Sequence, residues 1–375
     1  MKIGFICQKF VAVGGAERYL AGLMDAFVQR GHEVHIFANR WEGTPGATWH
    51  RVPMIRGLSF LKILSFAWFC RRELRRFPCD VVFSIERTLQ QDIFCAQGAC
   101  HREYLQQRRR FLPRWYRPTL RINPLHIAML WLEHHTFSPH RTRHVIAISH
   151  RGKAEIMRHY SFPADRIHVI YNGIDCNRFR RLAQSDRSHE PTFQLLFVGT
   201  GFERKGLAFA IRALAKLPPH VSLLIVGKGN RTPYEQLARK LAVANRIRFA
   251  GTSNDMTAIY NAADLLVHPA IYEPFGLVCA EALACGLPVV TTLVTGAAEL
   301  ITPGINGNIV DDPSDSAALA AAIQPFLNRH NVAETALAAR RAAESVEFSS
   351  TLEQTLTLLE QFLSANHSAP NPAGD

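Results

Sequence analysis

The amino-acid sequence predicts an α/β protein with two domains, each built on a parallel sheet. Short apolar runs that suit buried strands alternate with longer segments of helical periodicity, as in parallel-sheet proteins. The length of 375 residues is typical of two domains and allows a sizeable core in each. The clearest strand–helix unit lies in residues 264–290.

Residues 265–267 are predicted to be the first strand of this unit. Pro269 ends the strand, a loop follows over residues 272–276, and residues 277–285 have a helical pattern that ends before Gly286. In a parallel sheet this loop lies at the carboxyl end of a strand, which is the edge where such sheets bind ligands. The free N–H groups at the start of the helix suit a phosphate group.

Two carboxylates flank this helix start, with Glu273 before it and Glu281 inside it. Their spacing, in the context EPFGLVxxEALACGLPVV, resembles the EX7E motif of glycosyltransferase family 4, whose members are retaining enzymes. The resemblance implies the GT-B fold, in which two Rossmann-like doubly wound domains face a cleft. It also implies that Glu273 binds the donor sugar, that Glu281 binds the ribose, and that the donor contacts Phe275, Gly276 and Leu277. Two unrelated surface carboxylates are the alternative.

The chain opens with a strand–helix–strand pattern. Residues 2–7 are an apolar strand, a helix runs to about Arg30, and residues 34–39 are a second strand. The first turn contains Gly14 and Gly15, and glycine permits close approach of the backbone to a ligand. The turn is not a GxGxxG fingerprint, so we expect no nicotinamide cofactor.

The run GGAERYL resembles the opening of family 4 enzymes, which implies that Gly15 lies beside the donor phosphates and the acceptor. A tight turn without a ligand is the alternative. In the members that glucosylate the core of lipopolysaccharide, an acidic residue is expected two places after the equivalent of Arg18. Here Tyr19 follows Arg18 and the nearest acid, Glu17, precedes it, so Glu17 is a candidate for contact with the acceptor.

Further strands are predicted at residues 80–85, 92–95 and 144–149, the last being the final strand of the first domain. Residues 57–77 are apolar and then basic, which indicates either a helix packed on the sheet or a helix on a membrane surface. His101 follows a predicted strand and is a candidate general base or acceptor ligand, unless it is a structural histidine.

Residues 101–121 combine seven arginines and four aromatic side chains with one acid, Glu103. Together with the formal net charge of +12, this segment indicates either a solvated charged surface or contact with an anionic membrane. RNA is a less supported partner, and since no nucleic-acid-binding signature occurs, we do not expect nucleic acid.

No metal or cofactor is expected beyond the sugar-nucleotide substrate. The sequence has no D-x-D motif, and its histidine-rich segment, residues 134–144, has only Glu133 beside it as a carboxylate. The eight cysteines are scattered without a CxxC pair, as is typical of reduced thiols in the cytoplasm.

The segment RIHVIYNGID resembles the family's connection between domains and places the hinge near residues 171–190. The first domain, residues 1–171, is then expected to bind the acceptor, and the second, residues 172–344, the donor. A helix over about 345–365 is expected to pack back on the first domain. Residues 366–375, rich in Pro, Asn and Ala, are predicted to be disordered.

The second domain is predicted to begin with a strand at residues 195–198 and the loop GTGFERKG at residues 199–206. Glycines let backbone N–H groups approach an anion, and Arg204 and Lys205 add positive charge. The loop resembles the family's phosphate clamp, which implies that Arg204, Lys205 and the backbone of Gly201 stabilise the departing diphosphate. A solvated basic pair is the alternative.

The resemblance implies a retaining, metal-independent transferase that moves glucose from a UDP-sugar to a lipid-linked saccharide, such as lipopolysaccharide core. It would act in the cytoplasm at the inner face of the cytoplasmic membrane. The alternatives are a transferase for another cell-surface polysaccharide or glycolipid, a UDP-sugar epimerase on the same fold, and a sugar-nucleotide-binding protein without catalysis.

Overall fold

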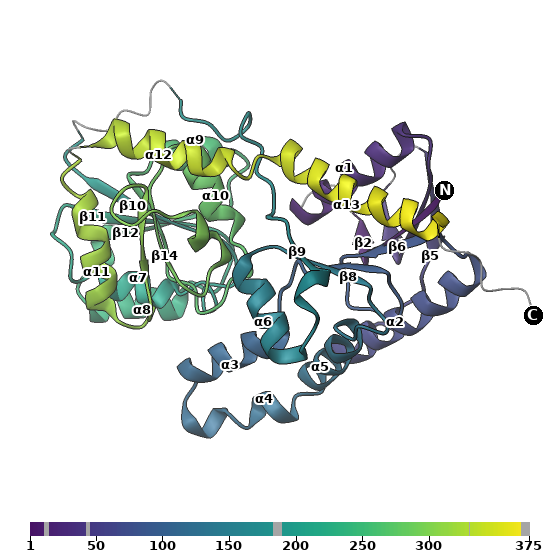
Figure 1. The fold of residues 1–375 in the computed structure, drawn as a ribbon. Coiled ribbons are helices and arrows are strands. Elements are labelled where there is room, and N and C mark those ends of the chain that lie inside the picture. The colour runs from purple at the N-terminus through teal and green to yellow at the C-terminus, as the bar shows by residue number, and fades with distance from the viewer. Residues whose placement is uncertain (11–14, 43–45, 183–189, 330, 369–375) are drawn as a thin grey trace, which may run out of the picture. The chain divides into compact units, whose positions relative to one another are not determined.

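The structure is a computed structural model, and it divides the chain into two compact units (Figure 1). One unit comprises Met1–Tyr171 with Ser349–Asp375, and the other comprises Asn172–Phe348. The structure describes residues 1–10, 15–42, 46–182, 190–329 and 331–368, with only the backbone described for 15–18 and 365–368.

The first unit is built on a seven-stranded sheet in the order β5-β3-β1-β6-β7-β8-β9, and all of its strand pairs are parallel. The strands are β1 (Lys2–Ile6), β3 (Glu33–Ala38), β5 (Ala47–Arg51), β6 (Val81–Ser84), β7 (Ile93–Cys95), β8 (His144–Ala147) and β9 (Ile167–Val169). Parallel strands are buried on both faces, and helices cover both faces here. The helices α1 (Gly15–Gln29) and α13 (Phe348–Ser368) lie on one side, and α2 (Ser59–Arg76) and α5 (Pro124–Thr136) on the other (Figure 1).

The sheet contains two strands that the sequence did not predict correctly. β9 pairs with β8 in the register Ala147↔Val169, so the prediction that residues 144–149 form the last strand of this sheet is wrong. β9 is only three residues long and is soon followed by the Asn-Gly pair at residues 172–173, which is why its pattern indicated a connection. β5 was missed because it is an edge strand of mostly exposed residues and therefore lacks an apolar run.

Helix α2 packs on the sheet. Phe66, Cys70 and Leu74 belong to one buried cluster with residues of the strands, including Phe37 and Val82. Of the two interpretations of residues 57–77, the packed helix is therefore confirmed. Its outer face still exposes large apolar side chains, namely Leu58, Leu61 and Trp68.

Several short elements lie beyond the carboxyl ends of these strands. β2 (Lys9–Phe10) and β4 (Arg40–Trp41) continue β1 and β3 and pair in parallel. The helices α3 (His101–Phe111) and α6 (His150–Tyr160) follow β7 and β8. α6 is capped by the Ser149 hydroxyl, which accepts a hydrogen bond from the Gly152 amide. Between α3 and α5 lie η1 (Arg114–Tyr116) and α4 (Thr119–Ile122).

The C-terminal helix α13 belongs to the first unit. The Tyr19 hydroxyl on α1 is hydrogen-bonded to Thr355 on α13, and Arg30 forms ion pairs with Glu353 and Glu360. α13 continues to Ser368, so the first three of the residues predicted to be disordered are helical. Residues 369–375 lie outside the described residues.

The second unit contains a six-stranded parallel sheet in the order β12-β11-β10-β13-β14-β15. Its strands are β10 (Phe193–Val198), β11 (Val221–Val226), β12 (Ile247–Gly251), β13 (Leu265–His268), β14 (Val289–Thr292) and β15 (Gly307–Val310). One face carries α7 (Leu207–Leu214), α8 (Thr232–Lys240) and α11 (Ser316–Ile323), and the other carries α9 (Met256–Asn261), α10 (Leu277–Ala284) and α12 (Val332–Glu344) (Figure 1). The two parallel sheets confirm the predicted α/β class.

Candidate functional site

Three charged side chains meet at the carboxyl edge of the second sheet. β10 and β13 are neighbours in the sheet, so the loops that follow them lie side by side. The first loop carries Arg204 and Lys205, and the second carries Glu273. Glu273 Oε2 accepts hydrogen bonds from Lys205 Nζ at 2.9 Å and from Arg204 Nη1 at 3.0 Å. The structure therefore brings together the three residues predicted to be catalytic.

Glycines make room for the Lys205 side chain. Gly199 has a φ of +136°, and a Cβ there would lie 2.5 Å from Lys205 Cδ. Gly206, at a φ of +78°, approaches Pro269 so closely that a Cβ would lie 1.9 Å from its carbonyl oxygen. Such positions require glycine on both steric and conformational grounds. The glycines of this loop thus fix the path of the lysine toward Glu273.

The loop that carries Glu273 is joined to residues 292–297 by backbone hydrogen bonds. The Glu273 amide donates to Val294 O, and the Gly296 amide donates back to Glu273 O, each at 3.0 Å. The Ala297 amide donates to Phe275 O at 2.7 Å. These backbone hydrogen bonds brace the loop that carries Glu273.

The charges around Glu273 keep it ionised. Burial alone would raise its pKa, but His268, Lys205 and Arg204 together lower the pKa well below the ordinary carboxyl value. His268 Nε2 lies 3.7 Å from Glu273 Oε2, which is too long for a hydrogen bond, so we attribute the effect mainly to the two cations. At neutral pH the cluster is a carboxylate between two positive groups.

His268 is a member of this cluster that the sequence did not single out. It is the last residue of β13 and is fully buried. Burial and the charge of Lys205 lower its pKa to about 4, so the imidazole is neutral at pH 7. Neither ring nitrogen has a hydrogen-bond partner. Its position at the end of a predicted strand, directly before Pro269, could have indicated a site residue. It was missed because a histidine in an apolar strand is most simply interpreted as a core residue.

Glu281 lies on α10 and is held by Tyr260. The Tyr260 hydroxyl donates to Glu281 Oε2 at 2.6 Å, and the tyrosine is almost completely buried. Burial and the nearby carboxylate raise the pKa of Tyr260 well above its ordinary value, so the phenol stays a donor. Tyr260 was missed in the sequence because an aromatic residue in a helical stretch resembles a core residue.

The other predicted donor-binding residues take different positions around this edge. Gly276 precedes α10 with a φ of +93°, and Phe275 is buried. Leu277, the first residue of α10, is half-buried. Gly201 has a φ of +73° with open space where a Cβ would be, so its backbone is accessible from that side.

The remaining candidates lie in the first unit. Gly15 begins α1, and the side chain of Glu17 lies outside the described residues. His101 is the first residue of α3, and its Nε2 lies 3.2 Å from His126 Nδ1. Burial and the charge of Arg87 lower the pKa of His101 to about 4, so it is a neutral imidazole at pH 7.

A buried ion pair that the sequence did not reveal supports the start of α3. Glu133 is fully buried, and its carboxylate accepts from the backbone amides of His101 at 2.6 Å and Arg102 at 3.0 Å. Arg87 binds the same carboxylate at 2.9 Å and also donates to Ala99 O at 2.7 Å. Ala99 has a φ of +44°, a conformation that non-glycine residues seldom adopt. This network shapes the loop that presents His101.

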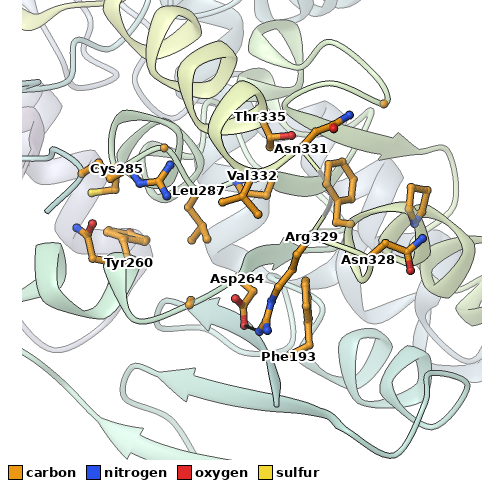
Figure 2. Close-up of a pocket in the computed structure, with 18 residues that line it drawn as sticks. Phe193, Tyr260, Asp264, Cys285, Leu287, Asn328, Arg329, Asn331, Val332 and Thr335 are labelled. Atoms are coloured by element: carbon orange, nitrogen blue, oxygen red, sulfur yellow. Dashed lines mark hydrogen bonds and ion pairs between the residues drawn. The ribbon is translucent and has the colours of Figure 1, made fainter. Parts of the chain in front are cut away.

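A separate cavity of about 290 Å³ lies at the opposite edge of the second sheet (Figure 2). Phe193, Asp264 and Leu287 line it from the amino ends of the strands, and Val332 lines it from α12. Figure 2 shows Arg329 beside Asp264, with which it forms an ion pair at 2.9 Å. This cavity is therefore distinct from the charged cluster at the carboxyl edge.

Neither metal-ligand groups nor membrane spans were found in the described parts of the chain. No three His, Cys, Asp or Glu side chains within them gather closely enough to hold a metal ion. Likewise, no helix there has the length and apolar character needed to cross a bilayer.

Comparison with known proteins identifies the family. The sequence-family model for Glycosyltransferase Family 4 matches residues 13–178, and the family model for Glycosyl transferases group 1 matches residues 179–345. The lipopolysaccharide glucosyltransferase WaaG of Escherichia coli is 30% identical over 329 residues, which cover 84% of this chain and 86% of that protein.

Solved structures agree. A crystal structure of WaaG, described as a glycosyltransferase involved in lipopolysaccharide biosynthesis, matches with a TM-score of 0.79 at 27% identity and covers 95% of this chain and 99% of that one. Anabaena HepE in complex with UDP-glucose matches with a TM-score of 0.71 at 20% identity, covering 96% of this chain and 100% of that one. The predicted GT-B fold is confirmed, and the chain belongs to glycosyltransferase family 4, a family of retaining hexosyltransferases.

Proposed function

We propose that this enzyme transfers glucose from UDP-glucose to a lipid-linked saccharide, with lipopolysaccharide core as the acceptor. The observation that carries the proposal is the contact of Arg204 and Lys205 with Glu273 at the carboxyl edge of a parallel sheet, where such sheets bind ligands. Further support comes from the similarity to WaaG, a lipopolysaccharide glucosyltransferase, and from the UDP-glucose complex of HepE.

The charged cluster suits the breaking of a sugar–diphosphate bond. The departing diphosphate gains negative charge, which Arg204 and Lys205 would stabilise together with backbone amides at Gly201 and at the start of α10. Without substrate, Glu273 forms ion pairs with both cations. When phosphate engages them, Glu273 becomes available for the sugar hydroxyls and for the positive charge that develops at the anomeric carbon. Glu281, oriented by Tyr260, would bind the ribose.

The first unit would bind the acceptor. His101 is a neutral imidazole held at the start of α3, so it can accept a hydrogen bond or a proton from an acceptor hydroxyl. Glu17 and Gly15 lie near the start of α1, at the same edge of the sheet. We therefore keep His101 and Glu17 as the acceptor-side candidates, with Gly15 beside the donor.

A membrane-facing surface would give access to a lipid-linked acceptor. Trp115 and Ile122 are 79% and 72% exposed, and Trp131 is also exposed. Exposed arginines lie among them, including Arg114 and Arg121. Aromatic side chains together with arginine suit the interface of an anionic membrane. This surface supports a peripheral location at the inner face of the cytoplasmic membrane.

Two measurements on the purified protein test the catalytic proposal. A thermal-shift screen of UDP, GDP, ADP and their sugar conjugates should show stabilisation by UDP and UDP-glucose, because a ligand that binds the folded state raises its apparent stability. Transfer should then require a deacylated lipopolysaccharide core oligosaccharide. Conversion of the UDP-sugar without an acceptor would indicate an epimerase. Binding of UDP without turnover on any acceptor would indicate a non-catalytic binding protein.

Vesicle co-sedimentation tests the membrane surface. Binding to phosphatidylglycerol vesicles should exceed binding to phosphatidylcholine vesicles and should weaken with salt. The variant Arg114→Gln/Arg121→Gln should bind less than Arg239→Gln/Lys240→Gln, which removes two exposed charges from α8 in the second unit. Equal binding to both kinds of vesicle would contradict the surface.

A further inference from the structure

A second ligand-sized pocket lies in the first unit, at the carboxyl edge of its sheet. Its volume is about 270 Å³. It lies where β2 and β4 extend beyond β1 and β3, next to the first turns of α2. Its lining consists of Lys9, Asn39, Arg40, Met54, Arg56, Gly57 and Lys62.

The lining is strongly basic. Lys9, Arg40, Arg56 and Lys62 contribute four positive charges, and none of the described residues that line the pocket is acidic. Within the described residues, none of these four forms an ion pair with an acid. Other cations of the same unit are neutralised, as Arg87 is by Glu133. A concave site with charge of one sign concentrates the opposite charge, so this pocket favours an anion.

The cations stand on a fixed framework. β2 and β4 hold Lys9 opposite Arg40 in a parallel pair. Asn39 is buried and donates to Val52 O at 2.9 Å, which ties the end of β3 to the end of β5. The Ile55 amide donates to the Ser65 hydroxyl at 3.0 Å, which fixes the segment carrying Arg56 against α2. A framework set before binding reduces the entropy lost when a ligand binds.

We propose that this pocket binds an anionic group, a phosphate or a carboxylate, carried by the saccharide acceptor; the inference rests on the proposed transferase function. The donor diphosphate already has a partner in the Arg204 and Lys205 pair of the other unit. A second anion site at the ligand-binding edge of the first unit must therefore serve a different group. Phosphate oxygens accept charge-assisted hydrogen bonds from several cations at once.

Exposed apolar residues border the basic lining. Ile55 and Leu58 flank Arg56 in the sequence, and Leu61 precedes Lys62, and all three apolar side chains are exposed. This arrangement suits an amphiphilic molecule whose anionic saccharide enters the pocket while its lipid stays at a membrane.

The test compares two double variants of equal charge. Arg40→Gln/Arg56→Gln removes two cations from the pocket, and Lys216→Gln/Lys240→Gln removes two exposed cations from the second unit. The probe is a deacylated lipopolysaccharide core oligosaccharide with its phosphates and carboxylates. We expect the pocket variant to raise the acceptor KM about tenfold to a hundredfold, since two charge-assisted contacts are lost. The kcat and the KM for UDP-glucose should stay near wild type, as should all constants of the control.

Chemically altered acceptors identify the anion. One acceptor sample is treated with hydrofluoric acid to remove its phosphates, and a second is treated to reduce its carboxylates. With one of these two samples, the acceptor KM of the wild type should rise to that of the pocket variant. If neither treatment matters, or if the variant fails only with acylated acceptor in phosphatidylglycerol vesicles, the inference is wrong. Thermal stabilisation by UDP separates the two proposals. If UDP does not stabilise the wild type, the transferase function is contradicted. Calorimetry of oligosaccharide binding to the wild type and to the pocket variant still tests the pocket in that case.

Discussion

The ammonium nitrogen of Lys205 lies 2.9 Å from Oε2 of Glu273, although the two residues are 68 positions apart in the chain. The same oxygen accepts from Arg204 at 3.0 Å. One carboxylate thus faces two cations, and the cluster keeps one net positive charge for a ligand. A phosphate that engages these cations replaces the carboxylate as their partner, so donor binding and the release of Glu273 are coupled.

The variant Lys205→Ala is expected to lower kcat about 100-fold to 1,000-fold, the usual cost of removing one donor that stabilises developing charge. Glu273→Ala should also abolish measurable transfer. Initial rates with saturating UDP-glucose measure both effects, with the melting temperature as a check on folding. The control Lys216→Ala removes an exposed cation of the same unit and should be silent. Wild-type turnover in either site variant would reject the assignment.

The buried His268 predicts a pH dependence of stability. Its pKa falls from 6.5 to about 4 on folding, so the unfolded chain binds the proton more readily. The contribution of the neutral His268 ring to the free energy of unfolding is therefore fully present above pH 6.5. This contribution is lost as the pH falls toward 4. The loss is about 3 kcal/mol at most.

Urea unfolding at several pH values measures this dependence. His268→Leu should reduce the fall in the free energy of unfolding between pH 6.5 and 4, and His101, whose pKa is also lowered to about 4, should account for part of the fall that remains. The loss below pH 4 that follows from the lowered pKa of Glu273 should persist. An unchanged slope in His268→Leu would show that His268 does not contribute to this pH dependence.

The sequence predicted most strands of the first sheet, the two neighbouring strands β10 and β13 of the second, and the charged cluster, because these depend on local patterns. Residues 265–267 form an apolar run, and the spacing of Glu273 and Glu281 is fixed by one loop and one helix. The neighbouring positions of β10 and β13 then bring Arg204 and Lys205 to Glu273.

What the sequence could not predict depends on long-range pairing. Arg87 and Glu133 lie 46 residues apart and form a buried pair, yet each resembles a surface residue when considered alone. The basic pocket likewise draws Lys9, Arg40 and Arg56 from separate elements. Tertiary packing alone brings such side chains together, so no single stretch of sequence contains the signal.

Two glycines with positive φ should differ sharply in their tolerance of alanine. A Cβ on Gly227 would lie 2.1 Å from the carbonyl oxygen of Gly199, whereas one on Gly304 would meet no atom within 4 Å. Gly304→Ala should cost about 1–2 kcal/mol of backbone strain. Gly227→Ala should cost about 3 kcal/mol or more, because backbone must also move.

Urea unfolding of both variants measures this difference in cost. In Gly227→Ala, the backbone of Gly199 must move, and Lys205 should move with it because its Cδ lies against Gly199. The displaced lysine should weaken the thermal stabilisation by UDP. Similar losses of stability in the two variants would indicate that the Gly199–Gly227 contact relaxes easily.

Neutralising Glu133 should destabilise the first unit strongly. In Glu133→Gln the buried Arg87 loses its counter-ion, and one side-chain oxygen that accepts hydrogen bonds becomes a donor facing other donors. The expected loss is about 3–5 kcal/mol of unfolding free energy. Glu353→Gln is the matched control, because its ion pair with Arg30 is largely exposed and such pairs contribute about 0–1 kcal/mol. Denaturant unfolding of both variants makes the comparison, and a Glu133→Gln protein as stable as the Glu353→Gln protein would show that the buried pair does not hold the start of α3.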